Sequence, residues 1–465
     1  MTTISSKTHI LVFPFPAQGH LIPLLDLTHN LANHGLTITI LLTPKNVSFV
    51  NPLLSIHPSI KTLVFPFPTN SSIPAGVENC KDLPGEFFPI MIRTLGDLYH
   101  PLLSWFKSHP SPPVAILSDM FLGWTEFLAN ELKIPRIVFS PSGAMALSVI
   151  YYLWRDMPGK REENDVVLFS GMPNCPKYPW WQISPIYRNY LEKYPDCEFI
   201  KDSFRANLVS WGVVVNSFTE LESAYLDYLR KEMGHDRVWE VGPLQPQIHD
   251  SSSKLIDRGG ASSVPVNDLT AWLDKRDDHT VVYVCFGSQT SLTDNQTVEI
   301  ASGLEKSGVN FIWCIKEHIY DMIPSGFEDR VAGRGLIIKG WAPQILILSH
   351  KAVCAFLTHC GWNSVLESLV AGVPMLAWPM GADQFVNANL LVDELKMAVR
   401  VCEGAKTVPN AAELARVLKE FKSENRVERE RSKKMSKMSL DAIKENGSSV
   451  KDFEELLQNL FAVKL

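Results

Sequence analysis

WAPQILILSHKAVCAFLTHCGWNSVLESLVAGVPMLAWPMGADQ, residues 341–384, contains a strand, a helix and a second strand in close succession. The apolar run Val353–Thr358 predicts the first strand, Trp362–Ala371 predicts the helix, and Pro374–Ala377 predicts the second strand. Strands that alternate with helices indicate a parallel sheet with helices on both faces.

The same alternation extends outward in both directions. In the C-terminal half we expect a helix at Thr293–Lys306 and strands at Val281–Phe286, Asn310–Ile315 and Gly335–Lys339. In the N-terminal half we expect helices at His20–His34 and Gly123–Leu132 and strands at His9–Phe13, Thr37–Thr43, Lys61–Phe65, Val114–Ser118 and Arg136–Ser140. The predicted fold class is therefore α/β, with two doubly wound Rossmann-like domains.

The pattern weakens in two places and so suggests the domain boundaries. Between about Trp154 and Ser210 we expect long loops and short helices. Residues 248–264 are rich in Ser, Gly and Asp, which is typical of a linker. The expected organisation is an N-terminal domain at 1–247, a linker at 248–264, a C-terminal domain at 265–440, and a helix at 441–465 that packs back on the N-terminal domain.

Composition excludes several classes of protein. The 465 residues include 44 Lys and Arg against 50 Asp and Glu, a net charge of −6 that gives no basic footprint for nucleic acid. The eight cysteines form no C-x-x-C pair, so neither a disulfide scaffold nor a zinc ribbon is indicated. We see no targeting segment and no membrane span, and expect a cytoplasmic protein.

His20 and Asp119 are candidates for a general base and its supporting carboxylate. His20 follows the first predicted strand, and Asp119 ends the fourth. In the common doubly wound order these two strands are neighbours, so both side chains would lie at the same end of the sheet. A carboxylate that orients a histidine makes it a general base. A helix-start histidine bonded to the backbone and an ordinary N-cap aspartate fit the same residues.

The start of the helix at Trp362 is a candidate phosphate site. Free N–H groups and the helix dipole favour an anion there, and His359, Asn363 and Ser364 can add donors. Trp341 offers a flat face to a nucleobase, and Glu367 can accept hydrogen bonds from ribose hydroxyls. Asp383 and Gln384 provide polar groups for a sugar. Taken singly, each of these residues also fits an ordinary cap or core position.

As a set, these residues resemble the signature box of plant UDP-sugar-dependent glycosyltransferases of natural products. The matching motifs inside the box are WAPQ, H-x-A-V, THCGWNS, the E of LES, GVP, WP and the closing DQ. Outside it they are P-x-x-G-H at 16–20, VVNSFTELE at 214–222, VGPL at 241–244 and VCFGS at 284–288. TPKN at 43–46 and DRGG at 257–260 resemble the branch that contains flavonol 7-O-glycosyltransferases.

The resemblance implies the inverting GT-B fold of family 1, in which two domains face each other across a cleft. The C-terminal domain would hold the UDP-sugar and the N-terminal domain the acceptor. The implied UDP-sugar residues are Ser288, Trp341, Ala342, Gln344, His359, Gly361, Trp362, Asn363, Ser364, Glu367, Asp383 and Gln384.

The resemblance also implies a role for most of these residues. Trp341 would stack on uracil beside the Ala342 backbone, and Gln344 and Glu367 would hold ribose. The residues implied to hold the diphosphate are His359, Asn363, Ser364 and Ser288. Trp362, Asp383 and Gln384 would contact the sugar, while His20 deprotonates the acceptor hydroxyl and Asp119 balances its charge.

Two positions depart from the family pattern, and three residues nearby resemble a metal site. Cys354 and Ala355 stand where the family commonly has glycines, and we expect these small residues to fit. Cys354, His359 and Cys360 imitate a metal cluster, but a fourth ligand is missing from the sequence pattern, so we expect no metal and no cofactor.

We therefore expect a UDP-glucose-dependent O-glucosyltransferase that acts on a small phenolic, a flavonoid, and works as a monomer. The resemblance implies glucose as the donor sugar, because a Gln at the position of Gln384 usually accompanies glucose in that family. Candidate residues of the acceptor pocket are Phe15, Phe87, Phe121, Trp124 and Trp180. The alternatives are a transferase for UDP-rhamnose, UDP-galactose or UDP-xylose, a non-flavonoid phenolic acceptor, and a non-catalytic small-molecule sensor. A dehydrogenase is disfavoured because no G-x-G-x-x-G opens a helix after a strand.

Overall fold

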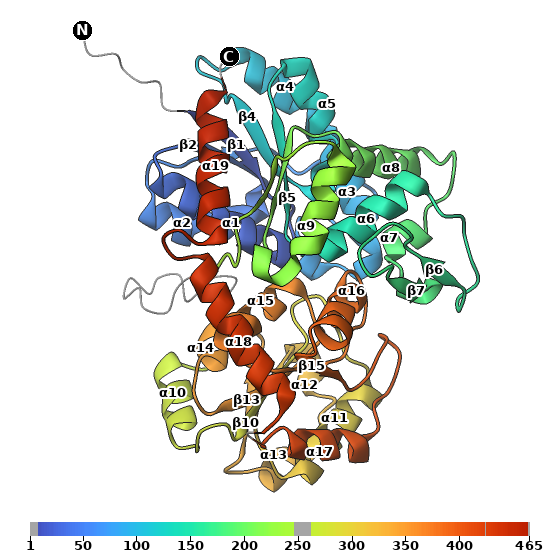
Figure 1. Cartoon of the computed structure of the whole chain (residues 1–465), viewed down its shortest axis with the longest axis vertical. Coiled ribbons are helices and arrows are strands. Elements are labelled where there is room, and N and C mark those ends of the chain that lie inside the picture. Colours follow the sequence, from blue (N-terminus) through green and yellow to red (C-terminus); the bar gives the residue numbers. More distant parts are fainter. Residues whose placement is uncertain (1–7, 246–261, 424, 464–465) are drawn as a thin grey trace. The chain divides into compact units, whose positions relative to one another are not determined.

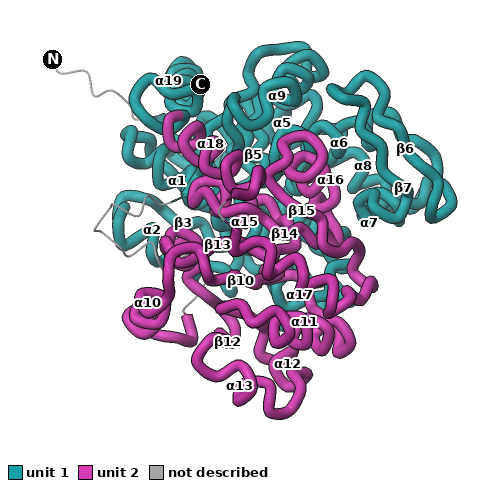
Figure 2. Tube along the Cα trace, turned by 60° about the horizontal axis from the view of Figure 1, so that its bottom comes forward, with its two compact units in different colours: residues 1–246, 442–465 teal, residues 247–441 magenta. Residues whose placement is uncertain are grey.

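The computed structural model describes residues 8–245, 262–423 and 425–463. The chain divides into two compact units, residues 1–246 with 442–465 (unit 1) and residues 247–441 (unit 2) (Figure 2). Most of the expected linker, residues 248–264, lies outside the described residues. Each unit is considered by itself below.

Unit 1 contains a seven-stranded parallel sheet in the order β3-β2-β1-β4-β5-β8-β9. The strands are β1 His9–Phe13, β2 Thr37–Leu42, β3 Lys61–Val64, β4 Ala115–Asp119, β5 Arg136–Ser140, β8 Gly212–Val215 and β9 Val238–Glu240. The longer helices are α1 Gln18–Asn33, α4 Tyr99–Ser108, α6 Ala144–Asp156, α8 Pro195–Leu208, α9 Thr219–Met233 and α19 Ser448–Ala462. The shorter elements are α2 Asn51–Ile56, α3 Phe88–Leu95, α5 Thr125–Leu132, α7 Pro185–Arg188, and the antiparallel pair β6 Val166–Leu168 and β7 Lys177–Pro179.

Unit 2 contains a six-stranded parallel sheet in the order β12-β11-β10-β13-β14-β15. Its strands are β10 Val281–Cys285, β11 Asn310–Ile315, β12 Gly335–Lys339, β13 Val353–Thr358, β14 Met375–Ala377 and β15 Ala398–Arg400. Its helices are α10 Val266–Asp274, α11 Asp294–Ser307, α12 Glu317–Tyr320, α13 Phe327–Arg330, α14 Gln344–Leu348, α15 Trp362–Ala371, α16 Gln384–Asn389, α17 Ala411–Glu420 and α18 Val427–Ala442. Both strand orders are of the doubly wound Rossmann type, which confirms the predicted fold class.

Helix α8 is one of the elements that the sequence did not predict. It occupies 14 residues of the segment expected to consist of loops and short helices. Its buried positions are Ile200, Ser203, Phe204, Ala206 and Asn207. Because two of these five are polar, the apolar period that marks a buried helix is weak in the sequence.

The last helix of the sequence completes the core of unit 1. Phe453, Leu456, Leu457 and Leu460 of α19 belong to the apolar cluster built on the strands of unit 1. Figure 1 shows the ribbon of α19 beside β1 and β2. Polar contacts attach the same helix to the edge strand β9. The backbone N–H of Glu240 donates to Asp452 Oδ2 at 3.0 Å, and the Trp239 indole N–H donates to Glu455 at 3.2 Å.

Two carboxyl groups meet where α19 contacts β9. The Glu240 side chain is 3% exposed and pairs with Arg230 at 2.8 Å, while Asp452 lies 3.7 Å from the same guanidinium. Burial and the neighbouring Glu240 carboxyl raise the pKa of Asp452 to about 8. The folded protein therefore holds a proton that the unfolded chain releases near pH 4.

This linkage predicts a pH-dependent stability of unit 1. The contribution of the proton is fully present below the pKa of the unfolded chain and is lost as the pH rises through the folded pKa near 8. Asp452→Asn keeps both hydrogen-bonding groups without the charge. We expect it to raise the thermal midpoint by about 2–4 °C at pH 8.5, the shift given by about 1 kcal/mol, and to change it little at pH 5.

Thermal unfolding followed at pH 5, 7 and 8.5 tests this expectation. Asp227→Asn is the matched control, because Asp227 also pairs with Arg230 but its side chain is 77% exposed. Equal shifts for Asp452→Asn at all three pH values would contradict the assignment of the bound proton to Asp452.

Candidate active site

In unit 1 the strand order brings His20 and Asp119 together. Strand β1 pairs in parallel with β4, with Phe13 opposite Ser118, so the residues after both strands lie at the same edge. His20 lies in the first turn of α1, and Asp119 is the last residue of β4. His20 Nδ1 lies 2.9 Å from Asp119 Oδ2. The His20 side chain is 15% exposed and that of Asp119 is fully buried, so only the histidine is accessible to a ligand.

Asp119 is fixed by contacts on both of its oxygen atoms. Oδ1 accepts the backbone N–H of Phe121 at 2.9 Å, which leaves Oδ2 to accept from His20. A neutral His20 therefore carries its hydrogen on Nδ1, and the lone pair on Nε2 is available to a substrate. This arrangement can remove a proton from an acceptor and stabilise the imidazolium that forms.

Aromatic rings surround the His20 imidazole. The ring centroids of Phe15 and Phe121 lie 5.4 and 4.6 Å from that of His20. Phe88 contacts both of these phenylalanines, and Phe204 of α8 contacts Phe121. Phe88 and Phe204 were not among the predicted pocket residues.

The other three predicted pocket residues have different surroundings. Trp124 is 1% exposed, and its aromatic contacts are with Phe13 and Tyr99. Trp180 is buried against Tyr187. Phe87 is half-buried and directly precedes α3. The structure thus brings Phe15 and Phe121 to His20 and puts Trp124 and Trp180 in other aromatic clusters.

Arg136 supports the end of β4 from inside the protein. Its guanidinium donates to Ser118 Oγ at 2.8 Å, to Asn207 and Ser210 at 2.9 Å, and to the Asp119 carbonyl at 3.4 Å. Burial lowers the pKa of Arg136 to about 10, so the group remains positive at neutral pH. These contacts fix the backbone at the end of β4, where Asp119 lies.

In unit 2 the turn between β13 and α15 holds His359 between two glycines. Cys360 has φ +64°, and Gly361 is the N-cap of α15. A Cβ atom at Gly361 would lie 2.5 Å from His359 Nε2, and one at Gly287 would lie 2.7 Å from the same atom. The ring therefore occupies space that only glycine leaves open. Burial lowers the pKa of His359 to about 4, so the imidazole is neutral at physiological pH.

Three polar side chains form a network beside this turn. Gln344 Nε2 donates to Ser364 Oγ at 3.0 Å and to Glu367 Oε2 at 2.8 Å. The Tyr283 hydroxyl donates to Gln344 Oε1 at 3.3 Å, a contact that the sequence did not suggest. Gln344 opens α14, three residues after Trp341, which follows β12 and is half-buried. Ala342 is 6% exposed.

The remaining predicted residues lie at the ends of β10, β13 and β14. Ser288 follows β10 and is half-buried, as are Asn363 and Asp383, and Trp362 is 4% exposed. Gln384 Oε1 accepts the backbone N–H groups of Met380 and Gly381 at 2.9 and 3.0 Å. These two contacts hold the side-chain oxygen of Gln384 against the preceding loop. All of these residues belong to the carboxyl edge of the sheet, where ligands of such folds bind.

Lys316 is a cation at this edge that sequence reasoning missed. It follows β11, and its ammonium group donates to Ser291 Oγ at 3.4 Å. Burial lowers the pKa of Lys316, and its charge contributes to the low pKa of His359. The sequence feature that could have identified Lys316 is its position directly after the apolar strand predicted at 310–315. With His359 neutral, Lys316 is a source of positive charge near the start of α15.

Two further structural observations concern metals and membranes. Among the residues that the structure describes, no group of three or more His, Cys, Asp or Glu side chains could hold a metal ion. Within the same residues, no helix is long and apolar enough to cross a membrane.

Comparison with known proteins identifies relatives along nearly the whole chain. The family profile "UDP-glucoronosyl and UDP-glucosyl transferase" matches residues 259–442. Flavonol 3-O-glucosyltransferase UGT89B1 of Arabidopsis thaliana is 55% identical over 471 residues, which cover 99% of this chain and 98% of that protein. Flavonol 7-O-rhamnosyltransferase of Arabidopsis thaliana is 40% identical over 477 residues, 99% of each protein.

A solved structure extends the similarity to three dimensions. The crystal structure of Arabidopsis thaliana UGT89C1 complexed with UDP-L-rhamnose matches with a TM-score of 0.82 at 40% identity, covering 98% of this chain and 100% of that chain. The same protein has also been solved in complex with quercetin. Because a 3-O enzyme is more similar to this chain than a 7-O enzyme, the resemblance to the 7-O branch stays a prediction.

Two Rossmann-like units, the GT-B structures that match them, and relatives aligned from end to end lead to one conclusion. The chain belongs to the plant family 1 UDP-glycosyltransferases, enzymes that transfer a sugar from a UDP-sugar.

Proposed function

We propose that the protein transfers glucose from UDP-glucose to a hydroxyl group of a flavonol, with inversion at the anomeric carbon. The observation that carries this proposal is the His20–Asp119 pair at 2.9 Å, with the rings of Phe15 and Phe121 against the histidine. A base among aromatic rings suits a flat phenolic acceptor. The names of the relatives described above support both the flavonol and the UDP-sugar.

On the acceptor side, His20 Nε2 takes the proton of the phenolic hydroxyl. The phenolic oxygen then forms a bond to C1 of the sugar, while the bond from C1 to the diphosphate oxygen breaks and its electron pair leaves with UDP. The proton remains on the imidazole, whose positive charge Asp119 stabilises through Nδ1. Attack from the face opposite UDP converts an α-linked donor into a β-glycoside.

On the donor side, we propose that unit 2 holds UDP-glucose along the carboxyl edge of its sheet. Trp341 and Ala342 would contact uracil, and the Gln344–Glu367 pair would meet the ribose hydroxyls. The N–H groups at Gly361 and the start of α15 would meet the diphosphate. The proposed diphosphate side chains are Ser288, His359, Asn363 and Ser364, and the proposed sugar contacts are Trp362, Asp383 and Gln384.

The donor sugar is assigned through Gln384. Its Oε1 atom is occupied by two backbone N–H groups, so its Nε2 hydrogens remain as donors to sugar hydroxyls. UDP-rhamnose, UDP-galactose and UDP-xylose are the alternative donors, and UGT89C1, which was solved with UDP-L-rhamnose, keeps the first of these open.

Incubation of the purified protein with a UDP-sugar and a phenolic panel tests the function. The panel contains flavonols, hydroxybenzoates and coumarins, and mass spectrometry detects the product. We expect a hexose adduct on a flavonol with UDP-glucose and much less product with the other three UDP-sugars. Fragmentation then locates the hydroxyl. Binding of UDP without product from any donor would favour the sensor alternative.

Removing the base should separate turnover from donor binding. We expect His20→Ala to lower kcat for a flavonol by about 100-fold or more, while the Kd for UDP changes less than about twofold. Asp119→Asn should have a comparable effect for a specific reason. The asparagine oxygen must still accept from the Phe121 N–H, so its NH₂ group faces Nδ1 and moves the histidine hydrogen to Nε2.

His100→Ala serves as the control for this pair of variants, because His100 is exposed on α4 of the same unit. Kinetics and calorimetric UDP titrations are measured on all three variants and the wild type. Near-normal turnover in His20→Ala would remove His20 from the role of base.

Lys316 provides a test of the diphosphate site. If its charge meets the diphosphate, Lys316→Met should weaken UDP binding about tenfold, the effect of about 1.4 kcal/mol, and leave uridine binding unchanged. Lys316→Arg should restore most of the affinity. Isothermal titration with UDP and with uridine measures both effects.

Lys306→Met is the matched control, since Lys306 is exposed near the end of α11. An equal loss of uridine and UDP binding in Lys316→Met would show that the substitution disturbs the site as a whole. Unchanged UDP binding would exclude Lys316 from the diphosphate site.

A further inference from the structure

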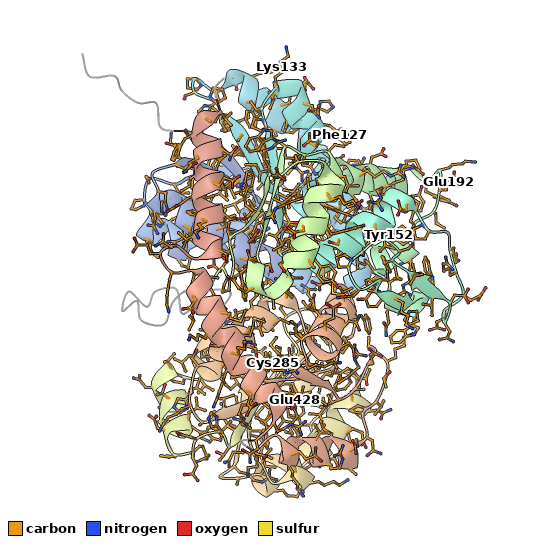
Figure 3. The ribbon with its side chains drawn as sticks, viewed as in Figure 1. Phe127, Lys133, Tyr152, Glu192, Cys285 and Glu428 are labelled. Atoms are coloured by element: carbon orange, nitrogen blue, oxygen red, sulfur yellow. The ribbon has the colours of Figure 1, made fainter. Side chains whose placement is uncertain are left out.

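Two cysteines of unit 2 lie side by side on neighbouring strands. Cys285 is the last residue of β10, and Cys314 lies in β11 (Cys285 is labelled in Figure 3). The strands pair in parallel with Val284 opposite Trp313, so the next positions are Cys285 and Cys314. The two side chains lie close enough for each thiol to be the first influence on the pKa of the other. Neither residue has a role in the proposed reaction.

Cys285 and Cys314 are both half-buried, as are Cys197 and Cys402, whereas Cys80, Cys354 and Cys360 are buried. The pair is distinguished by lying at neighbouring positions of two paired strands. The interaction with Cys314 lowers the pKa of Cys285 to about 7, while the interaction with Cys285 and burial raise the pKa of Cys314. At neutral pH one member of the pair is partly a thiolate, the nucleophilic form of cysteine, and the other is a thiol.

We propose that Cys285 and Cys314 form a reversible oxidation site, a dithiol that hydrogen peroxide converts into an intramolecular disulfide. The proposal rests on the register of β10 and β11, which puts the two cysteines at neighbouring positions, and on the partial exposure of both residues.

The chemistry proceeds in two balanced steps. The Cys285 thiolate attacks one oxygen of hydrogen peroxide, the O–O bond breaks, and the products are a sulfenic acid and hydroxide, which takes up a proton to become water. The Cys314 sulfur then attacks the Cys285 sulfur. The S–O bond breaks, the S–S bond forms, and a second water leaves with the Cys314 proton. A dithiol reductant reverses the reaction by thiol–disulfide exchange.

The backbone permits this bond. Adjacent strands lie about 4.8 Å apart, and disulfides span Cα–Cα distances of about 4.4–6.8 Å. A bridge between directly opposed residues of two parallel strands is close to the short end of that range. Strained disulfides are more easily reduced, which is typical of regulatory rather than structural bonds.

Both cysteines lie close to residues of the proposed donor site. Cys314 Sγ donates to the carbonyl of Gly340 at 3.3 Å, directly before Trp341. Cys285 lies two residues before Gly287, where an added Cβ would already meet the His359 ring at 2.7 Å. Forming the disulfide removes the Gly340 contact and shifts the end of β10. Oxidation should therefore weaken UDP binding, a consequence that rests on the donor site under Proposed function.

Mass spectrometry of the full-length wild type tests the bond itself. The protein is fully reduced, freed of reductant and treated with hydrogen peroxide at neutral pH. We expect the intact mass to fall by two hydrogen atoms and a proteolytic digest to contain a disulfide-linked peptide that joins the segments of Cys285 and Cys314. Dithiothreitol should restore the original mass. Absence of that peptide, while peroxide oxidises other cysteines, would overturn the proposal.

Three variants show whether the pair is responsible. Cys285→Ser and Cys314→Ser should each abolish the cross-linked peptide, and Cys402→Ser, the control at another half-buried cysteine of unit 2, should not. Phenylarsine oxide, which bridges two thiols, provides a second measurement. Phenylarsine oxide should form a complex with the wild type and with Cys402→Ser that only a dithiol dissociates. It should not form this complex with Cys285→Ser or with Cys314→Ser. Equal binding to all would overturn the assignment.

UDP titration measures the consequence. We expect oxidation to weaken UDP binding by the wild type at least tenfold, with recovery after dithiothreitol, and each serine variant to keep the affinity of its own reduced form. If the reduced wild type does not bind UDP, the proposed donor site is wrong. The proposed oxidation site is then still tested by the presence or absence of the cross-linked peptide. If the cross-link forms and UDP binding is unchanged, the coupling to the donor site is wrong.

Discussion

Parallel pairing within each sheet is the constraint on which the candidate site depends. When all strands point the same way, the residues that follow them gather at one edge, whatever their separation in the sequence. His20 and Asp119 are 99 positions apart and meet because β1 and β4 are neighbours. In unit 2 the same constraint brings together the loops after β10, β11, β13 and β14. Helices on both faces of each sheet leave this edge as the place where polar side chains can meet a ligand.

The two units use buried charge in opposite ways. In unit 1 the buried guanidinium of Arg136 donates to the backbone carbonyl of Asp119, whose side chain accepts from His20. In unit 2, His359 has lost its charge to burial, and its contribution to a diphosphate would be a neutral hydrogen bond. Lys316 and the N-terminus of α15 would then supply the positive potential. Such an arrangement can stabilise a departing phosphate through fixed dipoles and one cation.

Sequence reasoning succeeded where a pattern is local or where topology follows a rule. Strand–helix alternation predicted most strands of both sheets but not β8, β9 and β15. The doubly wound order predicted that β1 and β4 are neighbours. It failed where burial depends on side chains from distant elements. Phe204 reaches Phe121 only because α8 forms, and the polar residues on its inner face hide that helix. Trp124 follows β4 as Phe121 does, yet packs with Phe13 and Tyr99, because a few residues of turn decide which side of the chain a ring takes. The register that joins Cys285 to Cys314 is likewise invisible before the strands are paired.

The position of α19 has a consequence for how the chain is synthesised. Unit 1 begins the sequence, but the helix that fills its core with Phe453, Leu456, Leu457 and Leu460 comes after all of unit 2. On the ribosome, where domains generally fold as they emerge, unit 2 can be completed while unit 1 still exposes the apolar surface that α19 will cover. Unit 1 can therefore reach its final form only after unit 2 has been synthesised.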